Sequence, residues 1–173
     1  MTERKKQLLW VTLAVLAGIV SDQCTKEWIN RTIPAGSVPF KPDTFFFLTH
    51  ERNTGIIGGR FSGVPVVPFA APILASLILL YLFPQLNPAS RTQSIGFGLV
   101  VAGAAGNLFD RIVRGGVIDF LQFHFYFIDL NLPWKLYPAF NVADAWICLG
   151  VALLLFGWRH TREDKESDVP NAA

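Results

Sequence analysis

Long apolar stretches alternate with short polar ones along most of this chain. An α-helix needs about 20 apolar residues to cross a hydrocarbon core of roughly 30 Å, and the stretch from Val64 to Phe83 carries no charge. Further stretches are apolar through most of their length and become polar at one end. The pattern predicts four transmembrane helices, over residues 8–29, 64–83, 94–113 and 140–158.

Composition and charge agree with a membrane protein and indicate its orientation. Of the 173 residues, 51% are hydrophobic, and the net charge of +2 is too small to favour a nucleic-acid partner. Basic residues are concentrated in the short segments at one end of the predicted helices, which is the pattern of cytoplasmic segments. These residues are Arg4, Lys5, Lys6, Arg91, Arg159, Arg162 and Lys165. We therefore expect one multi-pass domain with both termini in the cytoplasm.

The two longer connections, residues 30–63 and 114–139, then lie outside the cytoplasm. In the first, residues 44–49 form a β-prone aromatic run, followed by the turn-like Asn53-Thr54-Gly55. The second connection is also rich in aromatic residues, which is typical of a membrane interface. The expected fold is an all-α membrane protein with four transmembrane helices and a small extracytoplasmic β-sheet.

Three polar clusters interrupt the apolar stretches, and the direction of the chain brings them to one side of the membrane. The first and third helices end outside the cytoplasm and the fourth begins there, so their polar ends share one layer near the outer interface. Asp119 lies in the connection between the last two helices. An ionisable group near hydrocarbon is costly and indicates a functional site. The clusters are Asp22 with Lys26, Asn107 with Asp110 and Arg111, and Asn141 with Asp144.

Two of these clusters have a structural interpretation beside the functional one. Asp22 and Lys26 are four residues apart with the acid first, the better order for a helical ion pair, so mutual neutralisation and participation in a site are equally supported. Asn107 and Arg111 share a helical face. For Asp110, orienting Arg111 or capping a turn is favoured over a chemical role.

Asp119 and Asp144 have no obvious salt-bridge partner nearby in the sequence. Gly115 and Gly116 precede Asp119 and allow a close backbone approach, and Asn141 can cap the last helix or bind the carboxylate of Asp144. Two carboxyl groups that meet in a partly dry site share one proton. One then acts as base and the other as acid on a water that attacks an amide carbonyl.

Other chemistries fit the sequence less well. There is no His-Glu-x-x-His motif, and His50, His124 and His160 are scattered, so we expect neither a metal nor another cofactor. The rival from another class is a proton or ion pathway that uses the intramembrane carboxylates. It is disfavoured because the clusters lie at one face and no transporter-like repeat is present. A non-catalytic assembly factor is a third possibility.

Five short motifs occur along the chain, from the first predicted helix to the last. They are Asp22-Gln23-x-x-Lys26, Asn53-Thr54-Gly55, Gly106-Asn107-x-x-Asp110-Arg111, Gly116-Val117-Ile118-Asp119-Phe120 and Phe140-Asn141-x-Ala143-Asp144. With these motifs the chain resembles a known family, the lipoprotein signal peptidases, also called type II or prolipoprotein signal peptidases. The motifs occur in that family's order, and their combination is highly specific. The resemblance implies a four-helix aspartic endopeptidase of the bacterial cytoplasmic membrane. Such an enzyme cuts prolipoproteins just before the diacylglyceryl-modified cysteine, near the outer leaflet.

The resemblance also implies a role for each candidate residue. Asp119 and Asp144 would be the catalytic pair. Asn107 and Arg111 would hold the substrate backbone, and Asp110 would support Arg111. The remaining residues would line or support the site; they are Asn53, Asn141, Asp22 and Lys26.

The expected partners are diacylglyceryl-modified prolipoproteins and membrane lipids, and we expect a monomer. The chain departs from the family pattern at Ile56-Ile57-Gly58, where small residues and a phenylalanine are usual. The wall of the binding groove is therefore expected to differ.

Overall fold

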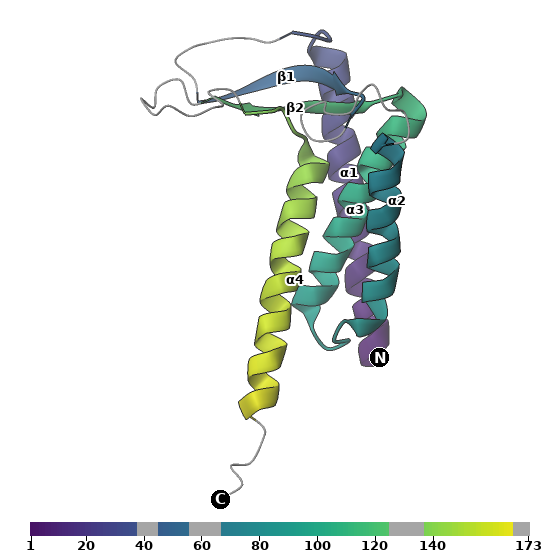
Figure 1. Ribbon diagram of the computed structural model, residues 1–173, viewed down its shortest axis with the longest axis vertical. Helices are drawn as coiled ribbons and strands as arrows, with labels where there is room; N and C mark the ends of the chain where they lie inside the picture. Colours follow the sequence, from purple (N-terminus) through teal and green to yellow (C-terminus); the bar gives the residue numbers. More distant parts are fainter. Residues whose placement is uncertain (38–44, 56–66, 125–136, 168–173) are drawn as a thin grey trace, which may run out of the picture.

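The computed structural model describes residues 1–37, 45–55, 67–124 and 137–167. Four helices run side by side, and a two-stranded sheet lies across one end of them (Figure 1). In chain order the elements are α1 (Glu3–Thr32), β1 (Phe46–Asn53), α2 (Val67–Leu82), the 3-10 turn η2 (Phe83–Gln85), α3 (Arg91–Arg114), β2 (Val117–Phe123) and α4 (Val142–Ser167). The predicted class, mostly helical with a small sheet, is confirmed.

Three helices within the described ranges are long and apolar enough to cross a membrane: α1, α3 and α4 as far as Arg159. They correspond to three of the four predicted spans. Helix α2 has 16 residues, and the predicted start of its span, residues 64–66, lies outside the described part of the chain. Large apolar side chains are exposed around the helices, as expected where lipid is the solvent. They include Leu13, Leu16, Val20, Leu77, Leu80, Leu155 and Phe156.

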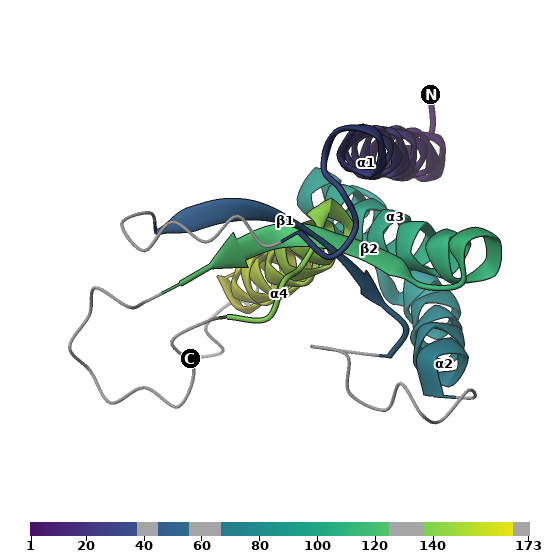
Figure 2. The ribbon, with the colours of Figure 1, turned by 90° about the horizontal axis from the view of Figure 1, so that it is seen from above.

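Helix α3 is the central helix and packs against α1, α2 and α4, as the view from above shows (Figure 2). Small residues allow this close approach. A Cβ atom on Gly96 would lie 2.8 Å from the carbonyl oxygen of Gly150 in α4, and one on Gly98 would lie 2.7 Å from the Cβ of Ala14 in α1. Membrane helices associate through such van der Waals packing, because lipid tails are as apolar as the helix surfaces.

The sheet is formed by β1 and β2, which run antiparallel with Glu51 opposite Asp119 and Asn53 opposite Val117. Gly115 ends α3 with a φ of 72°, a left-handed conformation that suits glycine, and the chain turns from there into β2. The β-prone run at residues 44–49 is confirmed as the start of β1 from Phe46 onward. Its partner strand, which the sequence did not reveal, is the segment that carries Asp119.

Candidate active site

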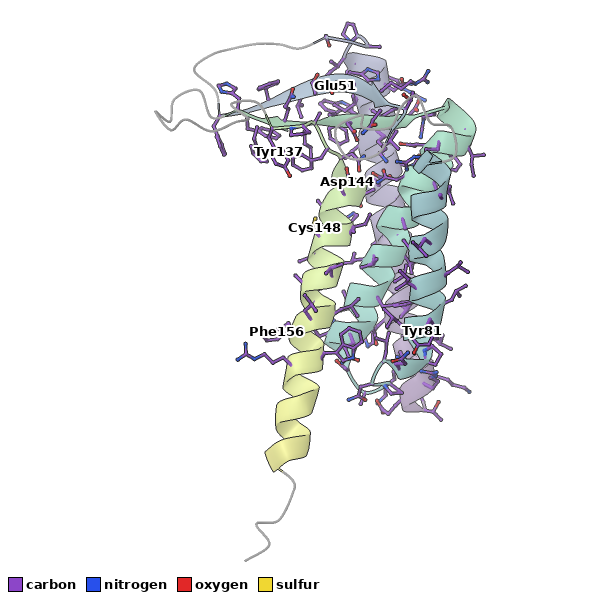
Figure 3. The ribbon with its side chains drawn as sticks, in the orientation of Figure 1. Glu51, Tyr81, Tyr137, Asp144, Cys148 and Phe156 are labelled. Carbon is purple, nitrogen blue, oxygen red and sulfur yellow. The ribbon has the colours of Figure 1, made fainter. Side chains whose placement is uncertain are left out.

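The predicted polar clusters meet at the sheet end of the helices. Asp144 lies in the first turn of α4 just beneath the sheet, whereas Tyr81 and Phe156 lie toward the other end (Figure 3). Both α1 and α3 run toward the sheet, so their polar C-terminal portions reach the same level (Figure 1). The convergence inferred from the direction of the chain is therefore observed, and hydrogen bonds connect its members.

Asp119 is held in β2 by two amide side chains. The residue is only 4% exposed. Asn53, at the end of β1, donates from Nδ2 to Asp119 Oδ2 at 2.9 Å, and Asn141 donates from Nδ2 to Asp119 Oδ1 at 2.7 Å. Both oxygens of this buried carboxyl group therefore accept an N–H.

Asp144 belongs to a reciprocal cap at the start of α4. The backbone N–H of Asp144 donates to Asn141 Oδ1 at 3.0 Å, and the backbone N–H of Asn141 donates to Asp144 Oδ2 at 3.1 Å. The other oxygen, Asp144 Oδ1, accepts from Asn107 Nδ2 at 2.8 Å. Asn141 is thus both the cap and the neighbour of the carboxylate, the two roles that the sequence left open.

Asn141 joins the two carboxyl groups, since its side chain binds Asp119 and its backbone binds Asp144. The pair is also coupled electrostatically. None of the ion pairs among the described residues includes either aspartate. Two coupled carboxyl groups that form no ion pair among the described residues are suited to share one proton.

Burial raises the pKa of Asp119 from its usual 3.8 to about 7. The negative charge of Asp144 acts in the same direction, while the hydrogen bonds from Asn53 and Asn141 oppose the rise. Burial dominates because a dry environment penalises the charged form of a carboxyl group. Asp119 is therefore far easier to protonate near neutral pH than an ordinary aspartate.

Beneath the pair lies a buried charged network centred on Lys26. Its ammonium group lies 2.9 Å from Asp22 Oδ2, 2.9 Å from Asp110 Oδ2 and 3.0 Å from Asn107 Oδ1. Lys26 and the two aspartates are all 0% exposed. The predicted ion pair of Asp22 with Lys26 is confirmed, and through Asn107 it is connected to Asp144.

The two acidic members of the network also hold the elements that carry the pair. Asp22 Oδ1 accepts the backbone N–H of Ala143 in α4 at 3.0 Å. Asp110 Oδ2 accepts the backbone N–H of Ile118, next to Asp119, at 3.3 Å. Asp110 forms ion pairs with Lys26 and, one turn further along α3, with Arg114, and it interacts electrostatically with Arg111. The expected support of Arg111 by Asp110 stays a prediction.

Arg111 lies beside the aspartate pair and interacts electrostatically with both members. Its guanidinium donates to the carbonyl oxygen of Asn107 at 3.2 Å and to that of Gly55 at 3.2 Å. Its Nε is buried without a hydrogen-bond partner among the described residues. This donor can bind a further acceptor at the site.

The geometry of a buried, coupled aspartate pair at the end of a helical membrane bundle limits the families that the chain can belong to. A family model described as signal peptidase (SPase) II matches residues 14–158. The chain belongs to the signal peptidase II family. Membership makes it a membrane-bound protease of lipoprotein processing.

Relatives across bacteria agree with membership in the signal peptidase II family. The lipoprotein signal peptidase of Aeromonas hydrophila is 34% identical, with 98% of each chain covered. That of Bacillus subtilis is 32% identical and covers 85% of this chain and 90% of its own length. A solved bacterial membrane enzyme is 26% identical with a TM-score of 0.71, covering 94% of this chain and 93% of its own. A second is 28% identical with a TM-score of 0.68, covering 86% and 91%.

Two residues of this signal peptidase II site had no assigned role in the sequence analysis. Gln23 donates to Asp22 Oδ2 at 2.9 Å and to Asp110 Oδ1 at 3.3 Å. Arg114 pairs with Asp110 and also donates to Gln23 Oε1 at 2.8 Å. The available signal was the spacing of Asp110 and Arg114, which are four residues apart on one helix. The departure at Ile56-Ile57-Gly58 lies outside the described residues.

Proposed function

We propose that this protein removes the signal peptide of prolipoproteins by cutting just before the diacylglyceryl-modified cysteine, with a water activated by Asp119 and Asp144. The observation that carries the proposal is the bridging of both carboxyl groups by Asn141. A shared proton on such a pair leaves one carboxylate free to act as base. The rival role in a proton or ion pathway has no comparable support in the family assignment.

In the proposed mechanism Asp119 holds the shared proton at neutral pH, because burial raises its pKa to about 7. Asp144 accepts a proton from the water, whose oxygen attacks the scissile carbonyl carbon. Asp119 donates its proton to the carbonyl oxygen, which gives a neutral gem-diol intermediate. Asp144 then passes the proton that it took from the water to the amide nitrogen, Asp119 takes a proton back from a hydroxyl group of the intermediate, and the C–N bond breaks to release the amine and the new carboxyl group. Arg111, through its buried Nε, and Asn107 hold the peptide backbone during these steps.

The membrane arrangement is part of the proposal. Helix α2 is the fourth crossing, and its 16 residues span about 24 Å at 1.5 Å per residue. The ends of α1 and α4 that lie away from the sheet face the cytoplasm, following the basic residues in the short segments there. The aspartate pair then lies near the outer leaflet, and the protein acts as a monomer.

The exposed aromatic residues in and beside the sheet suit a substrate that is anchored by lipid. Phe45 is 47% exposed, Phe46 is 42% exposed and Tyr137 is 46% exposed. Aromatic side chains favour the boundary between hydrocarbon and water. A cleavage point next to a diacylglyceryl group is held at the same depth, so membrane lipids and the precursor's own lipid are the expected partners.

The test compares the parent with Asp119→Asn and Asp144→Asn on a diacylglyceryl-modified precursor peptide. Both variants should remain folded and membrane-inserted, with turnover reduced by at least about 1,000-fold, because each removes one member of the proton-sharing pair. Glu3→Gln, which changes an exposed carboxyl group at the other end of α1, is the matched control and should turn over normally. Normal turnover by either aspartate variant would contradict the mechanism. Proton flux through liposomes containing the purified protein would instead support the pathway role.

A further inference from the structure

We infer that Lys26 is a positioning residue for the reaction, whose ammonium group fixes the side-chain amide of Asn107 so that its NH2 faces Asp144. The inference rests on the function proposed above. It assigns Lys26 a task in the chemistry beyond neutralising the acidic residues around it.

The ammonium group of Lys26 is enclosed by three oxygens: it donates hydrogen bonds to Asp22 Oδ2 and Asn107 Oδ1 and forms an ion pair with Asp110 Oδ2. It carries three N–H donors and no acceptor, and three oxygens surround it at 2.9, 2.9 and 3.0 Å. Two of these belong to the carboxylates of Asp22 and Asp110, and the third is Oδ1 of Asn107. The direction of the Lys26–Asn107 bond is therefore fixed, because Lys26 can only donate.

Asn107 can be oriented in only one way beside such a neighbour. Its Oδ1 accepts from Lys26 and also from Asn141 Nδ2 at 3.1 Å, which fills both lone pairs. Turning the amide over would place its NH2 against the ammonium group and the NH2 of Asn141. It would also place Oδ1 against the carboxylate of Asp144, to which Nδ2 now donates at 2.8 Å.

The side-chain amide of Asn141 is also held in one orientation, and the cap of α4 fixes it. The backbone N–H of Asp144 donates to Asn141 Oδ1, so the NH2 of Asn141 must face Asn107 and Asp119. The two oriented amides supply two of the four N–H groups that the oxygens of the aspartate pair accept, and Asn53 and the backbone of Asn141 supply the other two. Without Lys26, one of the two constraints on Asn107 is lost.

The charge of Lys26 also reaches the pair, because its positive charge opposes the rise in the pKa of Asp119. Removing it should displace to higher pH the loss of activity that accompanies deprotonation of Asp119. Other charged groups lie on the elements around the pair. They are the same in the two variants compared below, and Asp22 is replaced in both of them. These groups are Asp22 of α1, Glu51 and Arg52 of β1, and Asp110, Arg111 and Arg114 of α3.

The experiment must separate positioning from simple charge balance. Lys26→Met leaves two buried carboxylates with less compensation and can fail to fold. The informative comparison is therefore Asp22→Asn against Asp22→Asn with Lys26→Met, since the double variant removes one charge of each sign. Turnover of a diacylglyceryl-modified precursor peptide is measured across pH, together with unfolding. Lys6→Met, in an exposed ion pair with Glu3, is the control for the substitution itself and should match the parent.

We expect Lys26→Met in the Asp22→Asn background to lower kcat by about 100-fold, with KM within about threefold and the pH profile displaced upward. A kcat within about threefold of Asp22→Asn overturns the inference. So does a loss of kcat with the pH profile unmoved, because a structural role alone predicts that result.

A measurement on the parent keeps the inference testable even when variants do not fold. In protein labelled with 15N-asparagine, the side-chain NH2 signal of Asn107 is assigned by its loss in Asn107→Ser. That signal should shift with pH as the aspartate pair titrates, and a signal that does not shift overturns the orientation. Asp119→Asn separates the two proposals: if it is inactive while Lys26 proves dispensable, only the inference fails, and if it is active, the proposed function itself fails.

Discussion

Replacing Asp119 with asparagine is expected to change how the stability of the protein depends on pH, in addition to its activity. Burial raises the pKa of Asp119 from 3.8 to about 7, which corresponds to about 4 kcal/mol. Between these two values the folded protein holds a proton that the unfolded chain has released. The free energy of unfolding is therefore higher at low pH, where Asp119 of the folded protein is protonated, and it falls as the pH rises through about 7.

The expected size follows from the two pKa values. Between about pH 5 and about pH 8, this carboxyl group should lower the free energy of unfolding of the parent by about 3 kcal/mol. Asparagine does not titrate, so Asp119→Asn should lack this part of the pH dependence. The variant also places an NH2 group among the donors of Asn53 and Asn141, which costs about 1–3 kcal/mol at every pH.

The assay is unfolding in mixed detergent micelles, followed by tryptophan fluorescence, for parent and variant at both pH values. As the pH rises from about 5 to about 8, the free energy of unfolding of the parent should fall by about 3 kcal/mol relative to that of the variant. Glu3→Gln, which removes an exposed carboxyl group, should follow the parent. If parent and Asp119→Asn show parallel pH dependence, then burial does not hold a proton on Asp119 and the reasoning is refuted.

Two further predictions concern activity and packing. Turnover should fall as the pH rises through about 7, because the pair then loses its shared proton, and a rate that keeps rising with pH would contradict this. Gly106→Ala should destabilise the protein by about 1–3 kcal/mol and reduce turnover. The new Cβ would lie 2.5 Å from Asp22 Oδ2, an oxygen held in place by Lys26; parent-like unfolding and turnover would show that this oxygen can move.

The helices and the convergence of the polar clusters could be predicted because both depend on local pattern and chain direction. Apolar stretches of bilayer length predicted the helices, and alternation of direction then placed Asp22, Asn107 and Asp144 at one level. Neither step requires knowledge of which side chains touch. The reciprocal cap of Asn141 and Asp144 was also within reach, since it lies within one turn of a single helix.

The partner of β1 and the ion pair of Asp110 with Lys26 could not be predicted in the same way. Strand β2 pairs with a segment more than 60 residues earlier, and its apolar and polar residues do not reveal that register. Asp110 was expected to support Arg111 because the two are adjacent in sequence. In the folded protein Lys26 arrives from α1 and pairs with that carboxylate, which is a contact between distant segments.

The spacing of the buried charges bears on how such a site can be assembled in a bilayer. Helix α1 is synthesised well before α3, so Lys26 enters lipid before Asp110 exists. Asp22 lies one turn before Lys26, and Arg114 lies one turn after Asp110, so each helix carries its own counter-ion. A lone ion in hydrocarbon is costly, and neither helix has to insert one; the ion pair of Lys26 with Asp110 is added to the two local pairs once the helices meet.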